Sequence, residues 1–380
     1  MGEIKHRVNA RSVILSLLNG LKHTPQTIGP VLGVDPEKLE RVVRGEDPLT
    51  KEMEEKLIMV TGINQRDFYL PEFQHFFPVI DDTDDGVVIF RREDMEKSQR
   101  TISRGPENIP YYIYGDTAMS NLSTFRPEWI KQLYVNDGEN TDSLPDWAFN
   151  KGHLEHQVTY FIGPVNFHWK DKEGKKYVCQ MNTGDTNYIV PFVPHSFTTR
   201  VKGEGLILAV TYGGAVADSE FRSNLSVLDL EEYLRNVSER LPILSPEAVK
   251  EIKNGVAINS ISPCCQRDTK IRELAVSGGR YIGVRRENVF SDRWGYNIGG
   301  SSIILRWGLK NEGLLGSGDS FFIRPETPHV FVGTTAGQGK LLVVDIRPQQ
   351  GDPYTELALI GKYAGEEGLK RVHTETTRWY

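Results

Sequence analysis

The sequence predicts a mainly β protein of the α+β class, built from a helical N-terminal domain and two related β barrels. Three observations support this fold. The helical pattern is concentrated in the first part of the chain, short runs of β-branched and aromatic residues dominate after Asp81, and one β-rich region repeats the other. A chain of 380 residues is also too long for one ordinary core.

Composition limits the classes of protein to which the chain can belong. A net charge of −6 argues against non-specific binding to nucleic acid, which depends on Lys and Arg neutralising phosphates. No apolar run reaches the roughly 18–20 residues that span a bilayer, and the N-terminal apolar stretch lacks a secretory cleavage site. The cysteines, Cys179, Cys264 and Cys265, cannot form an extracellular disulfide framework. We therefore expect a cytoplasmic protein without membrane or nucleic-acid partners.

Residues 1–75 are expected to form a helical domain of the helix-turn-helix type. Thr24 and Asp35 each precede a proline, which is typical of an N-cap followed by proline at the first helical position. Gly33 stands where the chain must turn between the two helices that these caps begin.

Two barrels and a connecting segment are expected after this domain. The first barrel should cover residues 76–215, which contain strand-like stretches such as YYIYG, QVTYFIG and LILAVTY separated by Gly or charged turns. Residues 216–275 should be helical, because LDLEEYLRNVSERL and SPEAVKEIKNG mix charged and apolar residues as helices do. The second barrel should cover residues 276–380.

The two β-rich regions are copies of one unit. GDTNYIVPFVPHSF at 184–197 matches GDSFFIRPETPHVF at 318–331, with the GD, P, PH and F positions in identical register. After removal of four residues from a loop, VNFHW in the first copy meets IILRW in the second. This alignment places Asn150 on Asn288, His153 on Ser291 and Gln157 on Gly295. It predicts that the first barrel carries the chemistry and the second is scaffold, so His329 should not bind a metal.

Polar residues gather at two points of the first barrel. NKGHLEHQVTYF at 150–161 supplies His153 and Gln157 at the start of a strand, and a PH turn supplies His195. Four residues of straight strand span about 13 Å, too far for two ligands of one ion. Gly152 should therefore allow a bend that brings His153 back over Gln157. His156 and His168 are expected to be structural.

These motifs resemble those of the phosphonate-processing cupin oxygenases, a family that includes an epoxidase, hydroxyethylphosphonate dioxygenase and methylphosphonate synthase. The resemblance covers nearly the whole chain and implies tandem cupin barrels (double-stranded β-helix or jelly-roll). In the epoxidase-like pattern, NxxHxxxE is followed by a PH turn. Asn150, His153, Gln157 and His195 stand at these positions here.

The resemblance implies the site residues and the cofactor. His153, Gln157 and His195 would bind Fe(II), and Lys22 would reach over the active site from the helical domain. Arg104, Tyr112, Tyr114 and Asn150, together with Lys22, would bind the phosphonate. The partners would be a small phosphonate substrate and O2, and a homo-oligomer is expected.

Gln157 decides between branches of this family. The epoxidase pattern has Glu at this position, and the dioxygenase pattern takes its carboxylate from the position of Ile189, which cannot ligate. A set of His, Gln and His resembles the methylphosphonate synthase branch. The expected reaction is cleavage of the carbon–carbon bond of 2-hydroxyethylphosphonate to methylphosphonate and bicarbonate or CO2. The dioxygenase outcome, hydroxymethylphosphonate and formate, is the alternative.

A transcriptional regulator with a helix-turn-helix domain and a cupin sensor is the alternative from another class. Its recognition helix would be PEKLERVVRGE, in which Glu37 and Glu40 alternate with Lys38, Arg41 and Arg44. No basic stripe results, so an enzyme is favoured.

Overall fold

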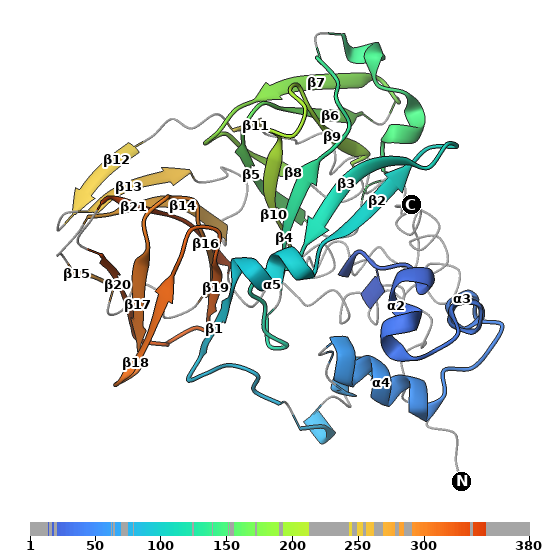
Figure 1. Ribbon diagram of the computed structural model, residues 1–380, viewed down its shortest axis with the longest axis horizontal. Helices are drawn as coiled ribbons and strands as arrows, with labels where there is room; N and C mark the ends of the chain where they lie inside the picture. The colour runs from blue at the N-terminus through green and yellow to red at the C-terminus, as the bar shows by residue number, and fades with distance from the viewer. Residues whose placement is uncertain are drawn as a thin grey trace, which may run out of the picture.

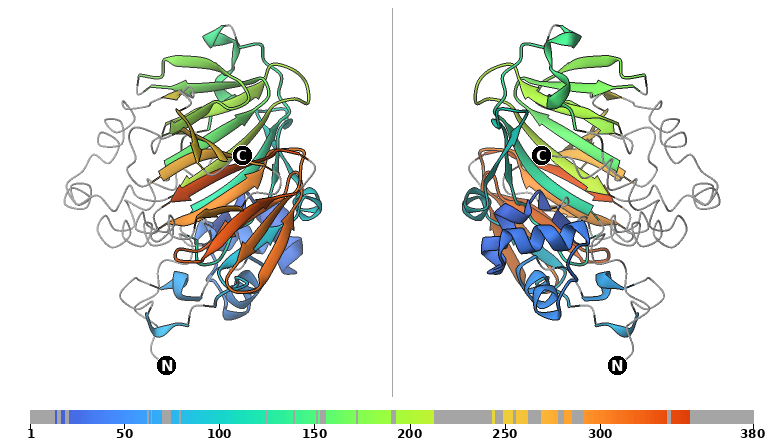
Figure 2. Two further views of the ribbon diagram at one scale, coloured as in Figure 1. Left: turned by 90° about the vertical axis from the view of Figure 1, so that its left-hand side faces the viewer. Right: turned by 90° about the vertical axis from the view of Figure 1, so that its right-hand side faces the viewer.

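The computed structural model places two β barrels side by side, with a helical domain below the first barrel (Figure 1). In both side views the first barrel lies at the top and the helices lie toward the bottom (Figure 2). The structure describes residues 14, 17–18, 21–61, 63, 65–69, 75–78, 80–123, 125–138, 140–150, 152, 156–171, 173–189, 193–212, 243–244, 249–253, 256–261, 269–277, 281–284, 291–334 and 337–346.

Capping residues define the helices of the N-terminal domain. Its described helices are α2 (Pro25–Leu32), α3 (Pro36–Arg44) and α4 (Lys51–Thr61), followed by a short 3₁₀ helix at Gln65–Phe68. The Thr24 hydroxyl accepts a hydrogen bond from the Thr27 amide, and the Asp35 carboxylate accepts one from the Glu37 amide. Both predicted N-caps are therefore confirmed. The apolar faces of these helices form a core of their own.

The first barrel packs two antiparallel sheets face to face. Within the described residues, the larger sheet has the order β11-β8-β5-β10-β4-β3-β2 and the smaller one the order β7-β6-β9. The larger sheet comprises β2 (Arg100–Arg104), β3 (Ile109–Gly115), β4 (Phe125–Gln132), β5 (His156–Ile162), β8 (Thr186–Ile189), β10 (Leu206–Tyr212) and β11 (Ile243–Leu244). The smaller comprises β6 (Val165–Lys170), β7 (Lys176–Met181) and β9 (His195–Thr199).

The second barrel has the same arrangement. Its larger described sheet has the order β1-β19-β16-β21-β14-β13-β12, and its smaller sheet has the order β15-β20-β17-β18. The larger sheet comprises β1 (Val87–Phe90), β12 (Val249–Lys253), β13 (Val256–Ile261), β14 (Thr269–Val276), β16 (Asp292–Asn297), β19 (Ser320–Ile323) and β21 (Gly339–Ile346). The smaller comprises β15 (Tyr281–Val284), β17 (Ile303–Trp307), β18 (Asn311–Leu315) and β20 (His329–Gly333).

The larger sheets pack against each other, and strands from outside the repeated units complete both of them. Aromatic side chains of the two barrels share one apolar core, in which the rings of Phe125 and Phe322 lie 5.9 Å apart. Strand β1 precedes the first barrel in sequence but pairs with β19 of the second, and β11 follows the first barrel but pairs with β8 within it. The short helix α5 (Arg92–Lys97) links β1 to β2. Residues 87–90 therefore belong to the second barrel rather than the first.

The helical expectation for the connecting segment is wrong where the structure describes it. Residues Val249–Lys253 form β12, which pairs with β13 in an antiparallel hairpin, and residues from Thr269 onward belong to β14. The two residues between β12 and β13 are Asn254 and Gly255, a pair that strongly favours a two-residue hairpin. This turn signal, together with VAINSI after it, outweighs the helix propensity of VKEIK. The predicted helix LDLEEYLRNVSERL lies outside the described residues.

Strand pairing confirms the repeat but shifts one part of its alignment. VNFHW and IILRW occupy the same position, because Val165 pairs with Thr199 as Ile303 pairs with Gly333. Gln157, however, pairs with Ile189 and Thr211, whereas the corresponding residues of the second barrel, Ile323 and Asp345, pair with Arg293. The counterpart of Gln157 is thus Arg293 and not Gly295. The turn between β16 and β17 is longer than that between β5 and β6, and this displaces the sequence register before it.

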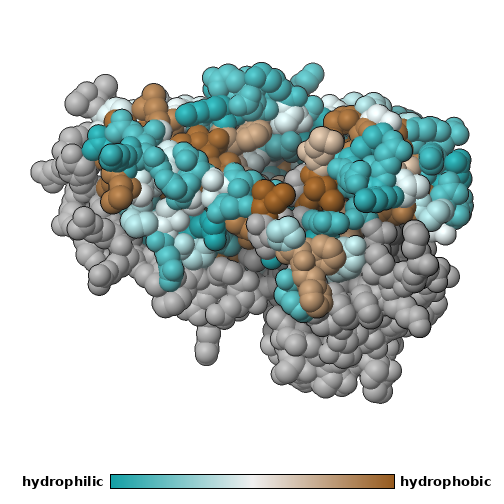
Figure 3. Space-filling view, turned by 90° about the horizontal axis from the view of Figure 1, so that it is seen from below, coloured by the Kyte–Doolittle hydropathy of each residue, from teal (hydrophilic) through white to brown (hydrophobic). Residues whose placement is uncertain are grey.

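No helix within the described ranges is long and apolar enough to cross a membrane. The exposed apolar side chains include Val31, Met59 and Phe76. On the coloured part of the lower face, apolar atoms form several patches separated by polar ones (Figure 3).

Candidate metal and substrate site

Asn150 and the first residue of β9, His195, are held together by several hydrogen bonds. The Asn150 amide donates to the His195 carbonyl at 3.0 Å, and the His195 amide donates to Asn150 Oδ1 at 2.8 Å. The Asn150 Nδ2 atom lies 3.0 Å from His195 Nε2. Both side chains are buried. The structure therefore brings together two predicted site residues that are far apart in sequence.

The hydrogen bonds of His195 suit a metal ligand. Its Nδ1 lies 2.8 Å from the Val193 carbonyl, which can only accept, so Nδ1 carries the proton. The lone pair of the ring is then on Nε2, facing Asn150 Nδ2. Metal-binding histidines commonly use one ring nitrogen in this way while the other donates to a carbonyl. The site residues thus fit a metal at Nε2, in place of the Asn150 contact.

Gln157 lies on β5 with its side chain buried inside the first barrel. Its Nε2 donates to the Thr159 hydroxyl at 2.8 Å, and Oε1 is the atom of this amide that has lone pairs to bind a metal. On the neighbouring strand β8, Ile189 pairs directly with Gln157 and is fully buried. Paired residues point to the same face of a sheet, so an amide and an aliphatic side chain meet at this position.

The third predicted ligand, His153, lies outside the described residues. Gly152, immediately before it, has a left-handed φ of 82° and donates its amide to Asn150 Oδ1 at 3.0 Å. Strand β5 begins only at His156. A bend before the strand, as the sequence predicts, is therefore present at Gly152.

Arg104 contacts the opposite face of β9 from His195. Its guanidinium donates to the Ala148 carbonyl, lies 3.5 Å from the Ser196 hydroxyl and is 4.9 Å from the ring centre of Tyr111. Ser196 follows His195 in the strand and so points to the other face. Arg104 therefore supports the chain just before Asn150, and its role as a phosphonate ligand stays a prediction.

The predicted tyrosines are both buried on β3. The Tyr112 hydroxyl accepts a hydrogen bond from the Phe197 amide at 2.9 Å and lies 3.4 Å from the Ser196 hydroxyl. The Tyr114 ring lies 5.8 Å from that of Tyr112 in an edge-to-face contact. Tyr112 therefore holds the strand that carries His195, whereas Tyr114 packs against the ring of Tyr112.

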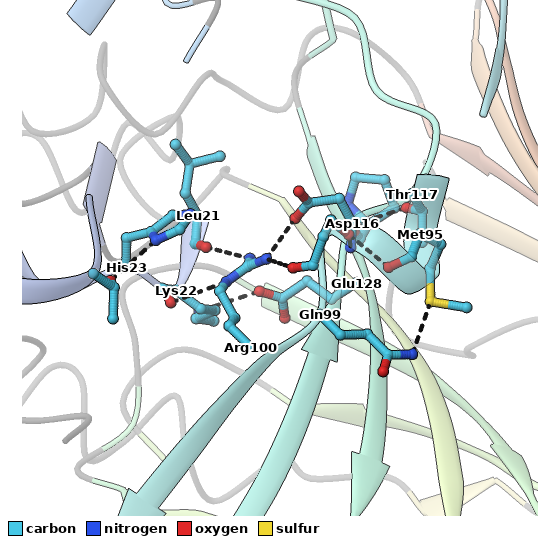
Figure 4. A network of polar contacts seen from close by, with 12 residues as sticks. Leu21, Lys22, His23, Met95, Gln99, Arg100, Asp116, Thr117 and Glu128 are labelled. Atoms are coloured by element: carbon cyan, nitrogen blue, oxygen red, sulfur yellow. Dashed lines mark hydrogen bonds and ion pairs between the residues drawn. The ribbon is translucent and has the colours of Figure 1, made fainter. Parts of the chain in front are cut away.

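Lys22 enters the first barrel from the helical domain. It has a left-handed φ of 53°, and its Nζ lies 3.5 Å from Glu128 Oε1 on β4, with both side chains buried. Arg100 of β2 holds the same turn by donating to the carbonyls of Leu21 and Lys22 (Figure 4). Lys22 therefore contacts the first barrel from the helical domain of the same chain, and its position over the active site stays a prediction.

Comparison with known proteins identifies the family. No family model matches the sequence. The chain is, however, 30% identical to the methylphosphonate synthase of Nitrosopumilus maritimus (strain SCM1), over 96% of this chain and 94% of that protein. The chain belongs to the methylphosphonate synthase family. It is therefore an enzyme.

Solved structures confirm the fold expected for this family. Hydroxyethylphosphonate dioxygenase from Streptomyces albus, with 2-hydroxyethylphosphonate and Fe(II) bound, is 23% identical with a TM-score of 0.56 over 98% of both chains. PhpD with cadmium is 15% identical with a TM-score of 0.51, over 97% of this chain and 100% of that one. The predicted tandem cupin fold is thus confirmed.

In this member of the methylphosphonate synthase family, the second barrel holds an arginine where the first has Gln157. Arg293 is buried, its Nη1 lies 2.8 Å from His329 Nε2, and its Nε donates to Asp345 at 2.6 Å. His329 corresponds to His195, and its Nδ1 likewise lies 2.8 Å from a carbonyl, that of Thr327. The guanidinium therefore occupies the ring nitrogen that a metal would need. This agrees with the predicted scaffold role of the second barrel.

Three residues of the site escaped the sequence reasoning. Thr159 stands two positions after Gln157, so strand alternation could have identified it. Ser196 directly follows the PH turn, and its hydroxyl lies 2.8 Å from that of Tyr111 and 3.4 Å from that of Tyr112. Glu128 lies in β4, far from every motif, and no sequence signal marks it.

Proposed function

We propose that this enzyme is a mononuclear Fe(II), O2-dependent dioxygenase that cleaves the carbon–carbon bond of 2-hydroxyethylphosphonate. The products are methylphosphonate and a one-carbon product, bicarbonate or CO2. His153, Gln157 and His195 hold the iron. When bound, the iron supplies the activation of O2, and the substrate supplies the electrons, so that neither 2-oxoglutarate nor an external reductant is needed.

The observation that carries this proposal is the pair formed by Gln157 and Ile189. Because the two residues are direct neighbours across β5 and β8, the barrel offers one neutral amide and no carboxylate at either position. The dioxygenase pattern requires a Glu at the position of Ile189. The His, Gln and His set matches the methylphosphonate synthase pattern instead, in agreement with the family of the chain.

Neutral ligands also favour an anionic substrate. Two imidazoles and an amide leave the charge of a divalent metal uncompensated, whereas a carboxylate ligand would cancel part of it. A phosphonate with a neighbouring hydroxyl can supply that negative charge and two oxygen ligands. The buried Lys22 ammonium adds a positive charge on the same side of the sheet.

Asn150 is placed to serve the substrate after metal binding. Its Nδ2 now contacts His195 Nε2, and a metal on that nitrogen takes over the lone pair. The Asn150 Oδ1 stays fixed by the amides of Gly152 and His195, so the side chain cannot swing away. Its amide group can then donate to a phosphonate oxygen, and Tyr112, Tyr114 and Arg104 are the remaining candidates that the sequence names.

The decisive experiment identifies the product. The protein is loaded anaerobically with Fe(II), exposed to O2 and 2-hydroxyethylphosphonate, and the products are read by phosphorus NMR. Methylphosphonate is the expected product. Hydroxymethylphosphonate as the sole product would establish the dioxygenase outcome and refute the assignment of the Gln157 and Ile189 pair.

The structure gives no support to duplex recognition by α3. Arg41 pairs with Asp47 at 2.9 Å, and Arg44 pairs with Glu40 at 3.2 Å. These arginines are therefore neutralised by neighbouring carboxylates rather than presented to phosphates. Binding of duplex DNA that weakens steeply with rising salt would reopen the regulator alternative.

A further inference from the structure

We infer that Glu128 is a positioning residue, whose buried carboxylate holds the Lys22 ammonium beside the row of side chains that leads to Gln157. The inference rests on the proposed function, because it names the residue that directs the lysine expected to meet the phosphonate. The ammonium would bridge two anions, the Glu128 carboxylate in the barrel wall and an oxygen of the substrate.

Glu128 lies on the same face of the larger sheet as Gln157. It pairs with Ala209 of β10, and Ala209 pairs with Thr159 of β5, so the three side chains form one row on one face. Neighbouring strands lie about 4.8 Å apart, which puts Glu128 roughly 10 Å from Thr159. Thr159 in turn accepts the hydrogen bond of Gln157. Ala209 contributes only a methyl group between them.

The pair of Lys22 and Glu128 is buried. The exposed fractions of their side chains are 7% and 8%, and Nζ lies 3.5 Å from Oε1. A carboxylate removed from water in this way is costly without a positive charge close by, and the Lys22 ammonium supplies one.

Docking of the helical domain does not account for this contact. Arg100 already fixes the turn, because its guanidinium contacts the carbonyls of Leu21, Lys22 and Ser98 as well as the Asp116 carboxylate (Figure 4). The Lys22 backbone adopts a left-handed φ of 53°, which residues with a side chain rarely do. The left-handed backbone of Lys22 directs its side chain toward β4. The contacts of Arg100 already attach the helical domain to the barrel, so attachment alone does not require this conformation.

Filling of space does not account for Glu128 either. A cavity of about 430 Å³ between α2, α4 and β4 borders Glu128, and its wall also includes Leu21, His23 and Arg100. A side chain whose role was to fill the interior would not leave such a space beside it.

A double-mutant cycle tests whether Glu128 acts through Lys22. Glu128→Gln keeps the shape and removes the charge, and we expect kcat/KM for 2-hydroxyethylphosphonate to fall at least about tenfold, chiefly through a higher KM. The Lys22→Met, Glu128→Gln double variant should then be no worse than Lys22→Met alone. Wild-type kcat/KM in Glu128→Gln, or losses that multiply in the double variant, would overturn the inference. Glu128→Asp should recover part of the loss.

Glu273→Gln is the matched control. Glu273 is also a buried carboxylate, 6% exposed, and pairs at 2.7 Å with Lys340 within the second barrel. The same chemical change at Glu273 should leave KM near its wild-type value. An equal rise of KM in both variants would mean that Glu128 acts only on the stability of the fold, against the inference.

A second measurement does not depend on the proposed reaction. The metal-free full-length protein is treated with an acetylating reagent, and acetylation of Lys22 is followed by peptide mass spectrometry. We expect Lys22 to react several-fold faster in Glu128→Gln, because its amine is no longer held, while the exposed Lys51 reacts equally in both. An unchanged rate at Lys22 would refute the contact. If Lys22 reacts faster in Glu128→Gln but the wild-type enzyme does not turn over 2-hydroxyethylphosphonate, only the proposed function is refuted.

Discussion

Under the proposed function, Thr159 orients the Gln157 amide so that Oε1 is the atom that binds the metal. Its hydroxyl accepts a hydrogen bond from Gln157 Nε2. Thr159→Val removes that acceptor at nearly constant volume, and the amide can then rotate. Residues that orient metal ligands typically contribute about 10- to 100-fold to metal affinity, so we expect iron affinity to fall roughly tenfold. The measurement is iron per chain at a series of chelator concentrations.

Thr159→Ser is the control for this experiment, since it keeps the hydroxyl and should retain iron as the wild type does. If Thr159→Val also retained iron at wild-type chelator concentrations, the Gln157 amide would be oriented by something other than Thr159. His195→Ala gives the reference for full loss, because it deletes the ring whose Nε2 is proposed to bind the iron.

His168 is a structural histidine with a predictable effect on acid stability. It is fully buried, its Nε2 lies 3.1 Å from the Thr198 hydroxyl, and burial lowers its pKa from 6.5 to about 4. Between these pH values the unfolded chain binds a proton that the folded chain does not. The stabilisation from neutral His168 is therefore complete above pH 6.5 and is lost as the pH falls toward 4, on the order of 3 kcal/mol in all.

The expected consequence is that the urea midpoint of the wild type falls more steeply between pH 6.5 and 4.5 than that of His168→Gln. Glutamine cannot take up the proton and keeps a polar group for Thr198. Replacement of the exposed His75 by Gln should leave the wild-type slope unchanged. Parallel slopes for wild type and His168→Gln would show that His168 takes up its proton equally in both states.

Strands β5 and β16 show how one element diverges after duplication. The two strands pair with equivalent strands of their own barrels, but β5 carries Gln157 and β16 carries Arg293 at the equivalent position. The positively charged guanidinium of Arg293 lies against the ring nitrogen of His329. In the second barrel, an arginine side chain therefore occupies the position that the metal is proposed to occupy in the first.

This difference predicts that His329→Ser leaves the iron content unchanged at the wild-type value per chain. Burial, reinforced by Arg293, also lowers the pKa of His329 to about 4, so the ring is neutral and accepts from the guanidinium. The measurement is metal analysis after loading with Fe(II) and gel filtration. Loss of half the iron would place a second metal in this barrel.

Sequence patterns predicted where the strands lie better than they predicted which strands pair with each other. Identical spacing of GD, P, PH and F was enough to find both barrels, because each motif occupies one strand and one turn. The exchange of β1 and β11 between the repeated units depends on packing between sheets, which leaves no spacing in the sequence. The equivalence of Gln157 and Gly295 failed because a longer turn before β17 moved the register, and only strand pairing shows where the extra residues lie.

The candidate site divides in the same way. Motifs in the sequence mark Asn150, Gln157 and His195, whose role as ligands stays a prediction, and the bend at Gly152 followed from the reach of a straight strand. Glu128 was missed, since its significance arises only when the helical domain is folded against β4. Its partner Lys22 was found by position within a family rather than by any local pattern.

At the scale of the whole molecule, the site draws on the helical domain and the first barrel together. Lys22 leaves a turn held by Arg100 and reaches Glu128 of the same chain, so we expect each chain to supply its own lysine. The helical domain therefore contributes a buried cation to the first barrel, and its α3 arginines are paired with acids.

A mixing experiment tests whether one chain supplies all parts of a site. Lys22→Met should keep only a small residual activity and His195→Ala none, and co-expression of the two should give no more activity than Lys22→Met alone, because every chain then lacks either the lysine or the iron ligand. If the lysine instead came from a neighbouring copy, some sites in a mixed oligomer would combine an intact Lys22 with an intact His195. Activity well above that of either variant alone would therefore show that the lysine acts across a subunit boundary, and the contact with Glu128 would then have to form between chains.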